Sequence, residues 1–266
     1  MKSEEVVRGY KFVGKDMGSS TYTYNKKTGD YDLPYIWKLG RWKKHSGKLK
    51  LCASGFHASN TIREVLQFAH LGNRLFMVEA KGRIMPGDSK FVATQMRLVK
   101  EAKNLDKIAL VFTIALIRRR FYKDNTKAGE IARKAIKAAE VLLKTNTERN
   151  LRNLKKIEEE IKTPNKVDNE AYSYLCWLIE FGNAGCLKKT RENNKKYNAL
   201  ERLSRVMSVS SKQIAERETE KLIGNQRRIL SSCFTDDIIE ALENKEYESQ
   251  CLLLTSIIEK SMRGEL

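Results

Sequence analysis

The chain is poor in the features that mark membrane, secreted and metal-binding proteins. No apolar run in its 266 residues approaches the roughly 20 needed to span a bilayer. Its first residues contain no apolar signal-peptide core. The five cysteines are scattered without a Cys-x-x-Cys pair, a usage typical of reduced thiols. We therefore expect a cytoplasmic protein with no membrane contact, no metal and no cofactor.

Motifs of the common enzyme classes are also missing. The sequence contains no Gly-x-Ser-x-Gly, no Gly-x-x-x-x-Gly-Lys-Ser/Thr and no Gly-x-Gly-x-x-Gly. Hydrolases with a nucleophile elbow, P-loop NTPases and dinucleotide-binding enzymes depend on these motifs for their turns and phosphate contacts. The residues therefore give no direct support for these activities, and an enzyme is the less favoured interpretation.

Acidic residues are scarce beside basic ones. Lys and Arg number 51 against 33 Asp and Glu, which gives a net charge of +18 and a pI near 9.6. Such an excess favours a polyanionic partner, such as nucleic acid, a nucleoprotein or an anionic membrane face. A Lys-rich proteome encoded by AT-rich DNA would give the same excess without such a partner, and the many Asn and Ile residues fit that alternative.

Glycine and proline become rare after residue 100. Residues 1–100 hold 10 of the 15 glycines, two of the three prolines and 12 of the 22 aromatic residues, which predicts short strands and turns. The fold class predicted is α+β, with a small N-terminal mixed α/β domain followed by an all-helical C-terminal domain. We expect three parts and a linker at 163–168: a basic α+β domain over 1–100, a helical extension over 101–163 and a C-terminal helical domain over 169–266.

Apolar periodicity gives the individual elements. In the first domain it predicts strands at 6–13, 37–39, 49–52, 75–80 and 90–99, a helix over 59–71 capped by Ser59, and a turn at 86–88. The stretch 22–35 gives no clear element. Helices are predicted at 102–122, 126–145, 148–162, 170–181, 198–207, 211–222, 226–230, 235–242 and 247–262. The highly charged helix over 148–162 is typical of an exposed arm or a short coiled-coil strand.

His57 is the first candidate for chemistry, because it lies at a predicted strand-to-helix turn. There it could bind an anion or act as a general acid or base. The alternative is that its ring hydrogen-bonds to a backbone carbonyl and locks the junction. Cys52 lies five residues before it, but no second Cys/His pair completes a metal site.

Glu79 is a carboxylate within the apolar strand at 75–80. A buried carboxylate is costly unless paired, and perturbed carboxylates cluster at functional sites. Strand alternation instead favours an outward Glu79, with Phe76 and Val78 facing the core.

The stretch from Trp37 to Lys50 alternates basic and aromatic residues, and residues 33–63 contain no acid. Lys and Arg neutralise phosphates, and an exposed Trp can stack on bases. The alternative is an amphipathic strand with core tryptophans and solvated lysines. A second basic cluster ends the helix over 102–122, where cations also suit a helix C-terminus. The candidate nucleic-acid-binding residues are Trp37, Lys38, Arg41, Trp42, Lys43, Lys44, Lys48, Lys50, Arg118, Arg119 and Arg120.

Four segments carry a resemblance to an uncharacterised domain of phage and prophage proteins. They are Gly9-Tyr-Lys-Phe12, Leu51-Cys-Ala-Ser-Gly-Phe-His-Ala58, Arg74-Leu-Phe-Met-Val-Glu-Ala80 and Asp88-Ser-Lys-Phe-Val-Ala93. They match a Lys-Gly-Phe-like start, a Cys-x-x-Gly-Phe-His-Ala core and two strands, over residues 6–100. The resemblance implies a phage or mobile-element origin and supplies no activity. The chain lacks the second cysteine that members often carry, which argues against a metal role.

Three functions follow as expectations. The leading one is a non-enzymatic phage accessory protein that binds RNA, DNA or a host nucleoprotein complex, and that inhibits a host defence nuclease in the manner of anti-CRISPR proteins. The second comes from a fold-level likeness to ADP-ribosyltransferases, which implies NAD contacts from Tyr10 or His57 and an acid at Glu79 or Glu101. The third is a structural or assembly protein in which the helices of 148–262 form a homo-oligomer.

Overall fold

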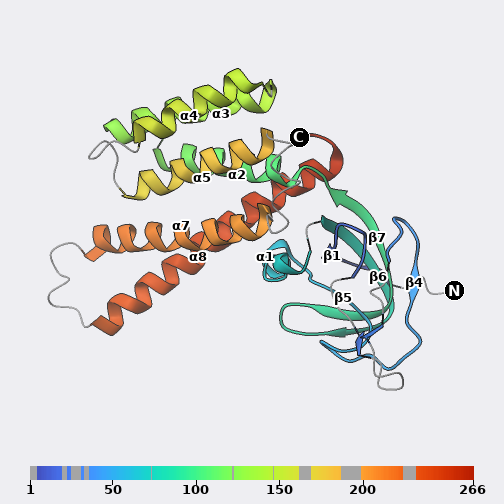
Figure 1. The fold of residues 1–266 in the computed structure, drawn as a ribbon. Helices are drawn as coiled ribbons and strands as arrows, with labels where there is room; N and C mark the ends of the chain where they lie inside the picture. The colour runs from blue at the N-terminus through green and yellow to red at the C-terminus, as the bar shows by residue number, and fades with distance from the viewer. Residues whose placement is uncertain are drawn as a thin grey trace. The chain divides into compact units, whose positions relative to one another are not determined.

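The computed structural model describes residues 5–19, 23–24, 31–32, 36–72, 74–121, 123–145, 147–161, 169–186, 199–223 and 232–266. They form two compact units, one made of Met1–Lys103 with Ile258–Leu266 and the other of Asn104–Ile257. The first is built on an antiparallel sheet and the second is helical, so the α+β class and the order of its two parts are confirmed (Figure 1).

A five-stranded sheet organises the N-terminal unit. Its strand order is β1-β6-β7-β4, and β5 also pairs with β7. The long β6–β7 hairpin is the centre of the sheet (Figure 1). Strand β1 pairs with β6, and both β4 and β5 pair with β7. The strands are β1 Val7–Val13, β4 Lys43–Lys44, β5 Phe56–Ala58, β6 Arg74–Pro86 and β7 Phe91–Ala102, and a separate pair is formed by β2 Thr23–Tyr24 and β3 Tyr31–Asp32.

The sheet closes on itself through the residue that follows β5. Tyr10 on β1 donates its N–H to the Ser59 carbonyl at 2.7 Å, and Ser59 donates back to Tyr10 at 2.9 Å. Because β5 pairs with β7, this bridge joins the two sides of the sheet. The inner face of the sheet holds the core. There, alternate residues of β6 and β7, Phe91 among them, pack with Trp37 and Phe56.

The connections around β5 differ from the prediction. Ser59 pairs with Tyr10 and does not cap a helix. Helix α1 Ile62–Leu66 begins instead at Thr61, in a capping box with Glu64, and a 3₁₀ turn follows at Ala69–Leu71. The predicted strands at 37–39 and 49–52 are wrong: the first contributes Trp37 to the core without forming a strand, and the second becomes a turn closed between Lys50 and Ser54.

Six helices make up the described part of the second unit: α2 Leu105–Phe121, α3 Lys127–Lys144, α4 Glu148–Ile161, α5 Asn169–Cys186, α7 Ala199–Ile223 and α8 Ser232–Arg263, of which the last residues belong to the first unit. The first three match their predicted spans closely. The expected exposed arm is wrong, because α4 buries Leu151, Leu154 and Ile161 as it packs against α3 and α5.

Two predicted helix breaks do not occur. The expected helices at 198–207 and 211–222 are one continuous α7, and those at 235–242 and 247–262 are one continuous α8. The predicted helix at 226–230 lies outside the described residues. No helix in the described ranges combines the length and the apolar character needed to cross a bilayer.

Candidate nucleic-acid interface

Five exposed cations of the acid-free stretch have no acidic partner among the residues that the structure describes. We call them the 38–50 basic surface: Lys38, Arg41, Lys44, Lys48 and Lys50. Two backbone bonds hold the segment along β7, from the Gly40 N–H to the Leu98 carbonyl at 2.8 Å and from the His45 N–H to the Thr94 carbonyl at 2.7 Å. A short strand and its flanks therefore hold exposed positive charge on a fixed backbone, with no acidic partner in the described ranges.

Trp37 is not part of that surface. Its side chain is 2% exposed and packs edge-on against Phe56, with ring centroids 5.3 Å apart. The Nζ atoms of Lys11 and Lys43 each lie 5.9 Å from its ring centroid, so Lys43 is directed toward the core. Stacking of a base on Trp37 is therefore excluded in this fold, and this expectation is corrected: the residue belongs to the core.

Trp42 lies at the edge of the outer sheet face and is partly exposed. The guanidinium carbon of Arg97 lies 4.8 Å from its ring centroid and the Nζ of Lys81 lies 5.1 Å from it. These cation–π contacts fix the indole among positive charges. Of the two tryptophans in the stretch, only Trp42 is placed to meet a ligand.

Glu79 points away from the core, as strand alternation predicts, into a cross-strand row with two arginines. Its register partners are Arg8 on β1 and Arg97 on β7. Arg97 donates to Oε2 from Nε at 2.9 Å and from Nη2 at 2.6 Å, and Arg8 Nε lies 3.5 Å from Oε1. The hydrogen bonds from Arg97 hold the pKa of this carboxyl below its usual range. Glu79 is therefore an ionised structural partner.

The other residues of the ADP-ribosyltransferase reading have their own partners. Glu101 accepts two bonds from Arg74, both at 2.8 Å. The Tyr10 hydroxyl lies 3.5 Å from Glu259, and burial together with that carboxylate raises the pKa of Tyr10. No hydrogen bond or ion pair found among the described residues links Glu79, Glu101 and Tyr10 to His57.

His57 locks the turn that precedes it. Its Nε2 accepts a hydrogen bond from the Cys52 N–H at 2.9 Å, so the ring is neutral with its proton on Nδ1. Burial, together with the charges of Lys11 and Lys90, lowers the pKa of His57 to about 4. This geometry supports the structural interpretation, because the ring accepts from the Cys52 N–H and also makes backbone hydrogen bonds at Gly55 and Lys50.

Lys11 is a lysine on the inner side of the sheet. Its Nζ donates to the His57 carbonyl at 3.0 Å, across the gap between β1 and β5. Burial lowers the pKa of Lys11 to about 8. The sequence gives no sign of this, because a lysine within a strand ordinarily faces solvent.

Ser54 and His45 form a contact that sequence reasoning missed. Ser54 Oγ and His45 Nε2 are 2.9 Å apart. Gly47 leaves room for the imidazole, because a Cβ at that position would lie 2.8 Å from Nε2. Only the glycine hints at the pairing in the sequence. Arg83 Nη2 approaches the carbonyl of the same glycine at 3.5 Å, so a further cation lies at this loop.

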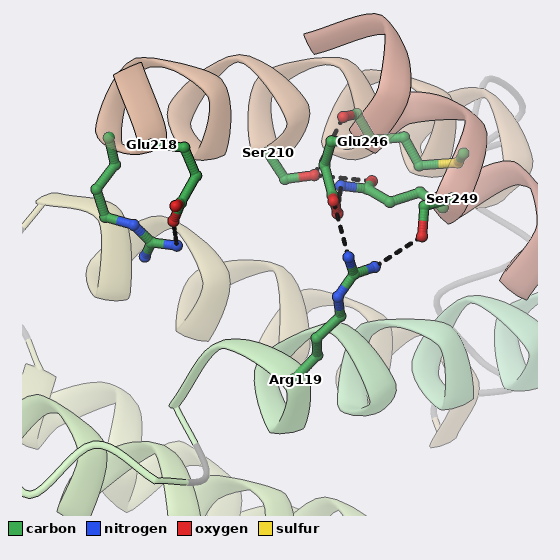
Figure 2. Close-up of polar contacts among 8 residues, drawn as sticks. Arg119, Ser210, Glu218, Glu246 and Ser249 are labelled. Atoms are coloured by element: carbon green, nitrogen blue, oxygen red, sulfur yellow. Dashed lines mark hydrogen bonds and ion pairs between the residues drawn. The ribbon is translucent and has the colours of Figure 1, made fainter. Parts of the chain in front are cut away.

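The second predicted cluster, Arg118 to Arg120, is engaged within the helical unit. Arg118 pairs with Glu140. Arg119 donates to Glu246 and Ser249 on α8, both at 2.9 Å, and Figure 2 shows its guanidinium reaching between these two side chains. Arg120 lies with its guanidinium carbon 4.7 Å from the Phe121 ring centroid.

These arginines therefore differ from the 38–50 basic surface. The Glu246 carboxylate that receives Arg119 also accepts a bond from Gln250, which in turn accepts one from Ser210 (Figure 2). Ser210 and Gln250 are fully buried. Arg119, whose side chain is 52% exposed, thus joins from the surface a polar network that is buried at Ser210 and Gln250, and this pairing favours a structural role over a phosphate contact.

Comparison with known proteins gives one match. A family described as "Domain of unknown function (DUF7666)" matches residues 7–110, which cover the sheet and the start of α2. No curated protein and no solved structure matches the chain. The family carries no assigned function, so the phage origin stays a prediction from the resemblance.

Proposed function

We propose that the N-terminal unit binds nucleic acid through its phosphates. The observation that carries the proposal is the 38–50 basic surface, in which five exposed cations have no acidic partner among the described residues. Unpaired cations at a protein surface attract polyanions, and binding is stabilised by the release of the counterions that phosphates hold. The net charge of +18 adds a long-range attraction of the same sign.

The 38–50 basic surface differs from the cluster Arg118 to Arg120 in whether its cations already have an acidic partner. An arginine that already faces a carboxylate must lose that partner before it can bind a phosphate, and the exchange gives little net gain. Arg118 and Arg119 are of this kind. Lys38, Arg41 and Lys44 have no acidic partner among the described residues, so they are the stronger candidates for phosphate contacts.

Naked RNA or DNA and a host nucleoprotein complex would present the same phosphates. The resemblance to phage proteins favours the complex, with inhibition of a defence nuclease as the biological role. The catalytic alternative is less supported, because Glu79 and Glu101 are each held by an arginine.

Fluorescence anisotropy with a labelled oligonucleotide tests the proposal. Lys38→Glu/Arg41→Glu should weaken binding strongly at low salt and should lower the slope of log K against log salt by roughly 2, since each phosphate contact contributes about 0.7 to 0.9. Lys155→Glu/Lys156→Glu is the matched control. These residues are exposed on α4, and the double variant changes the net charge equally.

Two results would contradict the proposal: no binding by the wild-type chain at low salt, or an equal effect of both double variants. Capture of host components on the immobilised chain, with and without nuclease treatment, then separates a nucleic acid from a protein target. A partner lost on nuclease treatment is held through nucleic acid.

A further inference from the structure

The outer face of the sheet carries a second group of cations beside the 38–50 basic surface. In the register of the sheet, Arg8, Glu79 and Arg97 lie side by side across β1, β6 and β7. Two residues further along the same strands, Gln95 on β7 lies between Lys81 on β6 and Lys44 on β4. Residues two apart on a strand share a face, so the two rows form one surface. We call it the sheet-face patch: Arg8, Trp42, Lys44, Glu79, Lys81 and Arg97.

Positive charge exceeds negative charge on this patch. It holds four cationic side chains and one carboxylate. The Arg8 side chain is 73% exposed and that of Arg97 is 35% exposed, and Lys44 is exposed as well. Glu79 neutralises one charge and fixes the Arg97 guanidinium against Trp42. The net field therefore still attracts phosphates.

An aromatic ring lies within this cationic field. A partly exposed indole surrounded by cations is the combination that single-stranded nucleic acids require, because a base stacks on the ring while the cations follow the backbone. Duplex bases are already stacked on one another, so a duplex uses the cations and not the ring. The Lys81 ammonium lies 5.1 Å from the centre of the Trp42 ring and adds positive charge beside a base stacked there.

The patch is bounded at one end. Tyr10 lies two residues after Arg8 on β1 and therefore on the same face of the sheet. Its hydroxyl lies 3.5 Å from Glu259, near the end of α8. A carboxylate there repels phosphates. The strand of nucleic acid would therefore lie over Arg8, Trp42 and Lys44, continuous with the 38–50 basic surface through Lys44.

From this arrangement we infer that the sheet-face patch binds single-stranded nucleic acid, with Trp42 stacking on a base and Lys44 and Lys81 contacting phosphates. The inference rests on the proposed function and deepens it, since it specifies which form of nucleic acid is preferred and which surface selects it.

Anisotropy titrations of the full chain at low salt would test it, using a labelled single strand of about 16 nucleotides and the same strand annealed to its complement. The wild-type chain should prefer the single strand. Trp42→Leu should weaken single-strand binding roughly 5- to 150-fold, the value of one stacked base, and should leave duplex binding nearly unchanged. Trp42→Phe keeps a ring and should retain most of the preference.

A second measurement does not depend on the leucine variant being folded. Adding the single strand should quench tryptophan fluorescence of the wild-type chain, and Trp42→Phe should lose that quenching while its unfolding curve stays close to wild type. Equal quenching in both proteins, or equal losses for single strand and duplex in Trp42→Leu, would overturn the inference. If the wild-type chain bound neither probe, the proposed function itself would be wrong.

Discussion

Glu79 and Arg97 form a two-bond ion pair across β6 and β7, with the carboxylate Oε2 at 2.9 Å from Nε and 2.6 Å from Nη2. The same guanidinium lies over the Trp42 ring. One carboxylate thereby sets the position of an arginine and, through it, of the partly exposed Trp42 indole. A residue that could have been a catalytic acid instead positions an arginine against Trp42.

Replacing Glu79 by Gln should destabilise the sheet. Hydrogen bonds to charged groups contribute about 1.5–3 kcal/mol each at most, and partial exposure of Arg97 reduces this, so we expect a loss of about 1–2 kcal/mol at pH 7. Chemical denaturation of the variant and the wild type measures it. Glu101→Gln, which breaks a two-bond pair with Arg74, is a useful comparison away from Trp42.

The pH dependence of that loss has a definite sign. The pKa of Glu79 is held below its usual value of 4.5, so the ion pair contributes fully above that value and is lost as the pH falls through the lower folded value. The difference between the wild type and Glu79→Gln should therefore be constant near neutrality and should close in acid. A difference that widened in acid would contradict the pairing.

Replacing His57 by Gln should remove an acid-sensitive step in stability. The pKa of His57 falls from 6.5 to about 4 on folding, so the unfolded chain binds a proton in this window and the folded chain does not. Stability is therefore full above the unfolded value and is lost as the pH falls from 6.5 toward 4. The loss in the wild type should reach about 1–2 kcal/mol after allowance for solvent screening.

Glutamine can accept the Cys52 N–H with its side-chain oxygen and does not titrate. His57→Gln should therefore keep the turn while flattening the stability curve between pH 6.5 and 4. Ring signals followed by NMR give an independent reading, because the His57 ring should remain neutral at pH 5.5. A His57 ring that became protonated near pH 6.5 would show that burial does not control it.

The sequence was informative where local rules decide the structure. The scarcity of glycine and proline after residue 100 predicted the helical unit, and apolar spacing placed α2, α3 and α4 to within three residues. These helices are long, and each buries a regularly spaced apolar face, so periodicity alone suffices. The acid-free stretch likewise predicted the 38–50 basic surface, because a run of basic residues without acids can be seen directly in the sequence.

The features that the sequence did not predict depend on contacts between residues that are far apart in the chain. Strand β6 was expected to end at residue 80, yet it continues through Gly82, whose φ of +78° lies at an irregularity between Lys81 and Ile84. Ser59 resembles a helix cap in sequence and is instead recruited by Tyr10. Trp37 and Trp42 are five residues apart with similar basic neighbours, and only the fold sends one into the core and leaves the other outside.

Replacing Gly9 by Ala should weaken the closure of the sheet. A Cβ at this position would lie 2.5 Å from the Ser59 carbonyl oxygen and 2.8 Å from the Phe91 ring, so the bridge between β1 and the end of β5 must open. We expect a loss of about 1–3 kcal/mol, the usual cost of overpacking, in thermal or chemical unfolding. Arg8→Ala, at a neighbouring and exposed position, should change stability by less than about 0.5 kcal/mol.

Replacing Cys52 by Gly should stabilise the turn before β5. Cys52 has a φ of +62°, a left-handed conformation that costs a residue with a Cβ about 1–2 kcal/mol and costs glycine little. Its N–H, which His57 accepts, is kept by glycine. Since glycine also makes the unfolded chain more flexible, the net gain should be about 0.5–1 kcal/mol in the free energy of unfolding. Ala53→Gly adds the same flexibility at a position without a positive φ and should destabilise. A gain in both variants, or in neither, would show that the conformation of Cys52 is not a source of strain.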